Sequence, residues 1–340
     1  MNIIDVAREA GVSTATVSRV LNGGSVSDDA RTAVEAAIKK LNYLPNNLAR
    51  GLVTGQTKTI GVIIHSVSNY FSMEFVEAVG AMYREQGYLL FVASTESAGS
   101  EEECRYISGF ISQRVDGIIL HDPPIDNYRN GFLKDVAKRI PFAMVHSFPD
   151  IYDINSVYVD QRLGMERVMS HLLGLGHRDI WFVRSEGFSE DLKEEVWRSG
   201  LRSVGREPSP DDLIFVPDGN KEIAITETEE IIGDLFQAGR RPSAIFACND
   251  LMCAGVAYAA SRHGIAVPDD LSLVGHDNTI LAASGRFSSV DLKMGSVGRA
   301  AVDLLAYAIE GKDPEPRRVL ISPDVFMRGS TKARALADPS

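Results

Sequence analysis

The stretch from Ser13 to Asn22 carries side chains that could read the edges of DNA bases. Its small and polar residues fall off the apolar stripe of a helical pattern, and they are Ser13, Thr14, Ala15, Thr16, Ser18, Arg19 and Asn22. The apolar stripe consists of Val17, Val20 and Leu21. An arginine can bond guanine O6 and N7 together, and a threonine can bond a base or touch a thymine methyl. The pattern is typical of a recognition helix that enters the major groove.

Two further helical patterns would hold this helix in place. The first begins near Ile4, after Asn2 as the expected N-cap with Asp5 in the capping-box position. Gly11 permits the tight turn between the first two helices. Ser27 is the expected N-cap of a third helix with apolar residues at helical spacing. This arrangement predicts a helix-turn-helix head, and the alternative is an ordinary helical hairpin with a solvated polar face.

Motifs spread over nearly the whole chain resemble the lactose-repressor (LacI/GalR) family of bacterial transcription factors. They are Asp5-Val6-Ala7, Ala10-Gly11-Val12-Ser13, Thr16 to Gly23, Asn42-Tyr43, Pro45-Asn46, Leu48-Ala49-Arg50, Thr59-Ile60-Gly61-Val62, Arg114 to Ile119, Leu175 to Arg178, Asn249-Asp250, Val267 to Asp270 and Arg328 to Thr331. The resemblance implies a sequence-specific DNA-binding regulator, a repressor in most of the family, that answers to a small-molecule effector such as a sugar or related metabolite.

The resemblance assigns base reading to Thr14 and Ala15. Arg19 lies one turn further along the helix, where it either pairs with guanine or contacts a phosphate. Phosphate contacts are expected from the hydroxyl and amide side chains of the same helix, which are Ser13, Thr16, Ser18 and Asn22.

Residues 45–52 form the expected hinge. A helix of this length is too short to be stable alone, so we expect it to fold on DNA. The resemblance implies that two such helices pair in the minor groove through Ala49, Arg50 and Leu52, with Leu52 wedged into the central base step. The alternative is that Leu52 packs against the body.

Charge is distributed unevenly along the chain. The whole sequence has a formal net charge of −11, whereas residues 1–58 carry seven Lys or Arg and five acids. A weakly basic head on an acidic body fits DNA contact through the head alone. Because the phosphate attraction of one such head is modest, we expect a homodimer on a near-palindromic operator.

From Thr59 onward, apolar strand-like runs alternate with helical patterns. This alternation predicts an α/β body of two doubly wound parallel-sheet subdomains, which the resemblance describes as periplasmic-binding-protein-like. The expected domains are the all-α head at 1–45, the hinge helix and linker at 46–58, the effector-binding body at 59–331 and a tail at 332–340. The body divides into an N-subdomain of about 59–158 and 291–317 and a C-subdomain of about 160–288 and 319–331.

Candidate effector contacts follow the ends of predicted strands. Those matched to family positions are Tyr70, Phe71, Asn249 and Asp277, and those suggested by their place at strand ends are His121, His146 and Asp160. Five of them have a structural alternative: loop packing for the two aromatics, helix capping for Asp160 and a core position for the two histidines. Trp197 stands where the family often has an arginine, and its ring would stack on the ligand.

Other functional classes fit the sequence poorly. It contains no nucleophile elbow, Walker loop or zinc-ligand spacing, so we predict neither an enzyme nor a cofactor. Its three cysteines form no metal or redox motif, which suits a reducing cytoplasm, and no run is long enough to cross a membrane. The disfavoured alternative, a secreted solute-binding protein, would require an export signal and would lack residues 1–58.

Overall fold

The computed structural model describes residues 1–21, 23–43, 56–96, 99–186, 188–219, 221–311 and 315–334. Contacts divide the chain into two compact units, Met1–Lys58 and Thr59–Ser340, which we call the head and the body. Four predicted DNA contacts, Asn22, Ala49, Arg50 and Leu52, lie outside the described residues. None of the helices in the described part is long and apolar enough to cross a membrane.

The head contains the three predicted helices, α1 (Ile3–Ala10), α2 (Thr14–Leu21) and α3 (Asp28–Leu41). Asn2 and Asp5 form the predicted capping box of α1, and Gly11 ends this helix at a φ of 66°. Ser27 caps α3 as predicted. The apolar stripes of the three helices meet in a small core of Val6, Ala7, Val17, Val34 and Ala37.

The body contains two six-stranded sheets in its described part. The first has the order β11-β5-β4-β3-β1-β2, and the second has the order β12-β10-β9-β8-β6-β7. All neighbouring strands are parallel except β12, which runs antiparallel to β10. The strands are β1 (Thr59–Ile64), β2 (Leu89–Ser94), β3 (Gly117–His121), β4 (Phe142–His146), β5 (Ser156–Val159), β6 (Ile180–Arg184), β7 (Leu213–Phe215), β8 (Ala244–Ala247), β9 (Ser272–Asp277), β10 (Ser288–Asp291), β11 (Arg318–Ile321) and β12 (Asp324–Phe326).

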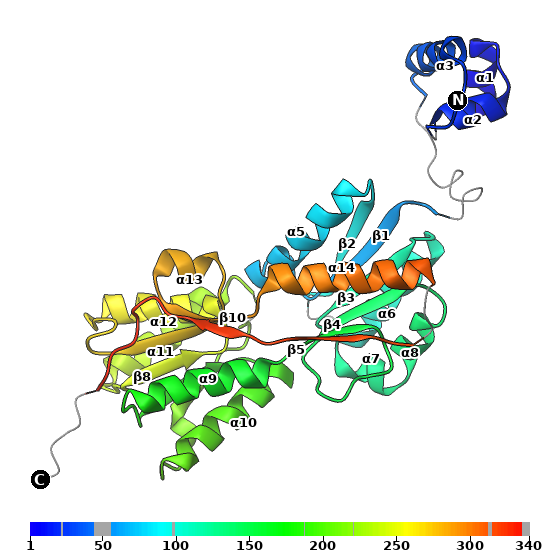
Figure 1. Cartoon of the computed structure of the whole chain (residues 1–340). Coiled ribbons are helices and arrows are strands. Elements are labelled where there is room, and N and C mark those ends of the chain that lie inside the picture. Colours follow the sequence, from blue (N-terminus) through cyan, green and yellow to red (C-terminus); the bar gives the residue numbers. More distant parts are fainter. Residues whose placement is uncertain are drawn as a thin grey trace, which may run out of the picture. The chain divides into compact units, whose positions relative to one another are not determined.

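Helices cover both faces of each sheet, as apolar parallel strands require (Figure 1). Those of the first half are α5 (Tyr70–Glu85), α6 (Gly99–Ser112), α7 (Ile125–Arg129), α8 (Phe132–Ala137) and α14 (Met294–Glu310). Those of the second half are α9 (Gln161–Gly174), α10 (Phe188–Ser203), the 3₁₀ turn η1 (Pro210–Asp212), α11 (Ala224–Gln237), α12 (Asp250–Arg262) and α13 (Ile280–Gly285). The predicted fold class is confirmed.

Three chain segments connect the two halves of the body. They follow β5, β10 and β11, and an ion pair of 2.7 Å between Lys293 Nζ and Asp324 ties two of them together. The predicted boundary between residues 317 and 319 is wrong, because β11 pairs with β5 of the first sheet through residue Ile321. The third crossover therefore lies between Ile321 and Asp324. The apolar run of edge strand β11, Val319-Leu320-Ile321, is only three residues long, and its sequence does not show which sheet it joins.

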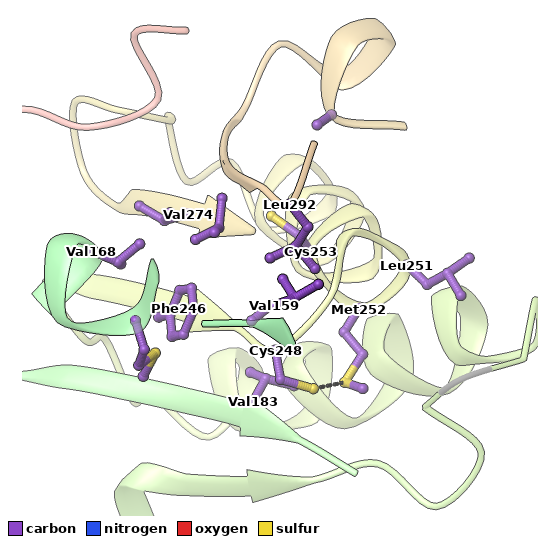
Figure 2. Close-up of a cluster of buried hydrophobic side chains, with 14 of the residues drawn as sticks. Val159, Val168, Val183, Phe246, Cys248, Leu251, Met252, Cys253, Val274 and Leu292 are labelled. Carbon is purple, nitrogen blue, oxygen red and sulfur yellow. Dashed lines mark hydrogen bonds between the residues drawn. The ribbon is translucent and has the colours of Figure 1, made fainter. Parts of the chain in front are cut away.

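The largest core cluster runs through both halves of the body. Figure 2 shows its part around β8 and α12, where Phe246 of β8 and Val274 of β9 occupy paired positions in the sheet. Cys248 and Met252 bring their sulfur atoms within 3.9 Å of each other at the end of this cluster. The core thus extends up to the carboxyl ends of the strands, and it supports the residues that follow them.

Candidate functional site

Helix α2 presents its predicted reading residues on the exposed side of the head. Thr14, Ala15 and Arg19 are exposed, whereas Val17 on the opposite side is fully buried. This division follows from helical periodicity, since the apolar stripe faces α1 and α3 and leaves the polar stripe outward. The three side chains predicted to contact bases are therefore all accessible.

Two of the predicted phosphate contacts also shape the start of α2. Ser13 Oγ accepts a hydrogen bond of 3.1 Å from the Thr16 backbone N–H, and the two hydroxyls lie 2.9 Å apart. Ser13 thus acts as the cap of α2. Ser18 is half-buried on the same helix.

The cations of the head differ in how they are engaged. Lys40 pairs with Glu9 at 2.7 Å, Arg8 lies 3.8 Å from Asp5, and Arg31 donates to the Gly24 carbonyl. The guanidinium of Arg19 makes no hydrogen bond or ion pair with any residue in the described part of the head. Its five donors are therefore available to DNA.

A cavity of about 340 Å³ lies between the two halves of the body. Its lining comes from segments that follow β1, β3, β4, β6, β8 and β9, together with residues of α5, α7, α9 and α10. The lining residues are His65, Asn69, Phe71, Ser72, His121, Asp122, Pro123, Pro124, Ile125, Asp126, Ser147, Phe148, Gln161, Glu186, Lys193, Cys248, Asn249 and Asp277. A crevice beyond the carboxyl ends of parallel strands is where open α/β sheets bind ligands.

Four of the predicted effector contacts line this cavity: Phe71, His121, Asn249 and Asp277. His121 stacks on Phe75 with ring centroids 4.5 Å apart, and burial lowers its pKa to about 3, so the ring is neutral. Asn249 accepts from the Met252 backbone N–H and donates to the Gly219 carbonyl. Asp277 ends β9 with a φ of 105° and lies 2.9 Å from His276 Nδ1.

The other four predicted contacts do not line the cavity. Tyr70 is exposed at the start of α5, and the neighbouring Phe71 lines the cavity in its place. His146 is buried and accepts from the Phe148 backbone N–H. Asp160 caps α9 by accepting from the Leu163 N–H, which was its structural alternative.

The prediction for Trp197 is wrong, because its side chain is fully buried. Its Nε1 donates to the Ile180 carbonyl at 3.1 Å, and its ring stacks on Phe182 with centroids 6.0 Å apart. Helix α10 packs on α9 and β6, and this places position 197 against the sheet. The ring fills the core and cannot reach a ligand.

Lys193 takes the cavity position on α10 that was expected of residue 197. It lies one helical turn earlier on the same face, it is only 3% exposed, and its Nζ donates to the Cys248 carbonyl at 2.9 Å. The spacing of four residues from Trp197 was a visible signal for a shared face. The sequence did not identify Lys193, because a helical pattern does not show which residues of a shared face lie at the cavity and which lie in the core.

Asp250, which was not predicted as a site residue, holds in place the backbone next to the cavity residue Asp277. Its carboxylate accepts from the Thr279 backbone N–H at 2.7 Å, from the Thr279 hydroxyl at 3.0 Å and from the Ser289 hydroxyl at 2.7 Å. Burial and the nearby charge of Asp277 raise the pKa of Asp250 to about 7. These bonds join the segments that follow β8 and β9, so they position Asp277.

Glu103 holds the α7 rim of the cavity. Asn127 donates to Glu103 Oε1 at 2.8 Å and to the Ser100 carbonyl at 2.8 Å. Burial raises the pKa of Glu103 to about 7, although the bond from Asn127 acts in the opposite direction. Between about pH 4.5 and 7, the folded protein therefore retains the Glu103 proton, which the unfolded chain has lost. The contribution of protonated Glu103 to stability is fully present below about pH 4.5 and is lost as pH rises through about 7.

Glu103→Gln should consequently stabilise the protein at high pH only. Glutamine keeps the acceptor for Asn127 and removes the ionisation, which should add about 2–3 kcal/mol to the free energy of unfolding at pH 8 and almost nothing at pH 4.5. Urea denaturation at the two pH values measures this, with Glu101→Gln on the exposed side of α6 as control. Equal effects at both pH values would contradict the assignment.

No group of three or more side chains that could bind a metal ion occurs within the described ranges. The arrangement consists of an exposed helix face, predicted to contact DNA, on one unit and a polar cavity in the other.

Comparison with known proteins agrees with this arrangement. Residues 2–46 match the model of "Bacterial regulatory proteins, lacI family", and residues 169–331 match the "Periplasmic binding protein-like domain". The chain is 30% identical to the HTH-type transcriptional regulator DegA of Bacillus subtilis over 97% of each chain. It is 31% identical to the ribose operon repressor of Escherichia coli, over 96% of this chain and 98% of the relative. A solved structure of the lac repressor dimer bound to operator and the anti-inducer ONPF aligns with a TM-score of 0.83 at 26% identity, covering 98% of this chain and 99% of that one.

Proposed function

The chain belongs to the lacI family of bacterial regulatory proteins, and from this premise we propose that two copies bind a near-palindromic operator under the control of a small ligand held in the cavity of the body. The chain is a DNA-binding transcriptional regulator of the repressor type, with an effector-binding domain that resembles periplasmic binding proteins. Its homologues are regulators and not enzymes. The proposal concerns its assembly, its contacts and its ligand.

The exposed face of α2 supports the DNA-binding part of the proposal. Thr14 and Ala15 at the start of the helix would contact base edges, and Arg19 would bond guanine or a phosphate. Ser13, Thr16, Ser18 and Asn22 would bond phosphates, and Ala49, Arg50 and Leu52 would act in the minor groove. The cavity supports the second part, because Phe71, His121, Asn249 and Asp277 reach it from both halves of the body.

Selection of operator DNA tests the function directly. The full-length protein is incubated with fragments of its host genome, and the retained fragments are sequenced. We expect a common site with two inverted half-sites and a steep loss of affinity with salt. Retention of unrelated fragments, without a shared motif, would contradict sequence-specific recognition.

An apolar surface on one edge of the first sheet supports the homodimer. Strand β2 pairs only with β1, and its residues Leu89, Phe91 and Val92 are 57%, 43% and 43% exposed. An exposed apolar edge strand is a site of association. The aligned lac repressor structure is a dimer by its description, so we propose that a second copy covers this edge.

Phe91→Glu should therefore weaken the dimer. A charge placed at a buried apolar contact is expected to raise the dissociation constant at least tenfold, which corresponds to about 1.4 kcal/mol. Sedimentation at low micromolar concentration measures the mass. Leu320→Glu is the matched control, since Leu320 is 58% exposed on the opposite edge strand, β11, and should leave the dimer intact. A wild-type tetramer, or a dimer unaffected by Phe91→Glu, would contradict this interface.

A further inference from the structure

We propose that the ligand of the body cavity is a small cation, a protonated amine that carries additional hydroxyl or N–H donors. The inference rests on the proposed function, because it specifies the ligand of the same site. It depends on four properties of the cavity. Two buried polar atoms lack hydrogen-bond partners, carboxylates outnumber ammonium groups, the strongest donors already bond within the protein, and aromatic side chains form part of the lining.

Two buried side chains of the lining lack hydrogen-bond partners for one atom each. Gln161 is 7% exposed, and its Nε2 donates to Ser147 Oγ at 2.9 Å, which leaves Oε1 without a donor. His121 is 3% exposed, and its Nδ1 has no partner. A buried polar atom without a partner costs about 1–3 kcal/mol, so a ligand that reaches both atoms recovers that cost. Gln161 Oε1 accepts only, and it therefore requires a donor on the ligand.

The charges around the cavity are mostly negative. Four carboxylates line it, from Asp122, Asp126, Glu186 and Asp277, against a single ammonium from Lys193. Asp126 and Glu186 form no hydrogen bond or ion pair through their carboxylates within the described chain. An anionic ligand would be repelled by this set, whereas an ammonium would be attracted to it.

A further carboxylate, from the half of the body that contains the first sheet, lies near this negative charge. Glu74 lies on α5, two residues beyond the lining residue Ser72, and is half-buried. Burial, followed by the charges of Asp277, Asp250 and Asp291, raises the pKa of Glu74 to about 7. These carboxylates belong to α5, α12, β9 and β10, and a bound cation would reduce the repulsion between them.

The strongest donors of the lining are already engaged inside the protein. Lys193 Nζ donates to the Cys248 carbonyl at 2.9 Å, and Asn249 Nδ2 donates to the Gly219 carbonyl at 2.7 Å. None of the described lining residues is an arginine, the side chain that a bidentate contact to a carboxylate or phosphate would need. The site therefore offers acceptors more readily than donors.

The aromatic side chains Phe71 and Phe148 complete the wall on the side of the first sheet. Aromatic faces attract ammonium groups by about 0.5–2 kcal/mol, more when water is excluded, and they also pack against sugar rings. Carboxylates and aromatic rings around one small cavity are the combination that selects an amine over a neutral or anionic molecule of the same shape. The cavity volume of about 340 Å³ suits a molecule of roughly monosaccharide size.

Matched sets of sugars test the charge preference on the full-length protein. The probes are glucosamine, glucose and glucuronate, and galactosamine, galactose and galacturonate, each at millimolar concentration in a thermal denaturation assay. We expect an amine member to raise the melting temperature by several degrees, with smaller shifts from its alcohol and no shift from its carboxylate. Asp277→Asn and Glu186→Gln should reduce the amine-induced shift, whereas Glu230→Gln, on the exposed side of α11, should retain it.

A second measurement needs no ligand. Glu74→Gln should raise the melting temperature of the ligand-free protein by a few degrees at pH 8, because Glu74 is half-buried near other carboxylates. Glu230→Gln should leave it unchanged, because Glu230 is exposed to solvent.

The outcomes separate this inference from the proposed function. A shift produced by glucuronate or galacturonate, or the absence of any shift from both sets, would overturn the cationic ligand. Neither result would affect operator selection, which tests DNA recognition independently.

Discussion

Arg19→Ala is expected to abolish high-affinity operator binding while leaving the head folded. The Arg19 guanidinium is exposed and makes no hydrogen bond or ion pair with the described residues of the head, so its loss should leave the helices folded. A bidentate contact to guanine is worth about 1–3 kcal/mol, and a dimer uses it twice. We expect a loss of about 2–6 kcal/mol, or roughly thirtyfold to ten-thousandfold in affinity, in a filter-binding or fluorescence-anisotropy titration with the selected operator.

Repeating the operator selection with this variant distinguishes the two roles of Arg19. A base contact predicts relaxed preference at one position of each half-site, and Arg19→Lys would not restore it, since lysine lacks the forked donor pair. A phosphate contact predicts equal weakening on all sequences and a smaller salt dependence, largely restored by lysine. Lys39→Ala, at an exposed position on α3, is the control. Unchanged operator affinity in Arg19→Ala would contradict both roles.

Trp197→Ala should destabilise the body instead of altering ligand affinity selectively. The side chain is 0% exposed, and its removal leaves a large cavity against Phe182 and an unpaired carbonyl at Ile180. Substitutions of this kind cost about 3–5 kcal/mol, a large fraction of the stability of most domains. Urea denaturation measures the loss directly.

A conservative variant and a neighbouring position separate packing from ligand contact. Trp197→Phe keeps a ring in the core and should lose less stability, with ligand affinity preserved. Lys193→Met keeps a side chain of similar length at the cavity and should change ligand affinity more than Trp197→Phe does. If Trp197→Ala kept the unfolding free energy of the wild type and lost ligand binding, the buried placement of Trp197 would be wrong. The result would instead favour a ring that stacks on the ligand.

The elements of the fold were predictable because they depend on neighbours along the chain. The capping box at Asn2, the turn at Gly11 and the apolar stripes of the head helices are all local, and all occur as predicted. The inner parallel strands were equally visible, since burial on both faces makes them continuous apolar runs. The place of strand β11 was not, because its apolar run of three residues is short and its pairing with β5 is a contact between segments distant in sequence.

The candidate ligand site was predictable only in part. A residue at the end of a strand can be recognised in the sequence, but the direction of its side chain cannot. Phe71, His121, Asn249 and Asp277 reach the cavity, whereas His146 turns into the protein and Asp160 caps a helix. Local hydrogen bonds from Phe148 and Leu163 decide those two cases. Such hydrogen bonds depend on the local backbone geometry, which cannot be read from the sequence.

The sequence alone determined the class of protein, the DNA-reading helix and the alternation of strands and helices, because these follow from residue type and periodicity. Only the tertiary structure decided which residue of α10 lines the cavity. Trp197 and Lys193 share one helical face, and the packing of α10 on α9 and β6 buries the first in the core and brings the second to the cavity. A helical pattern defines a face, but the position of that face along the neighbouring sheet is set by contacts between segments distant in sequence.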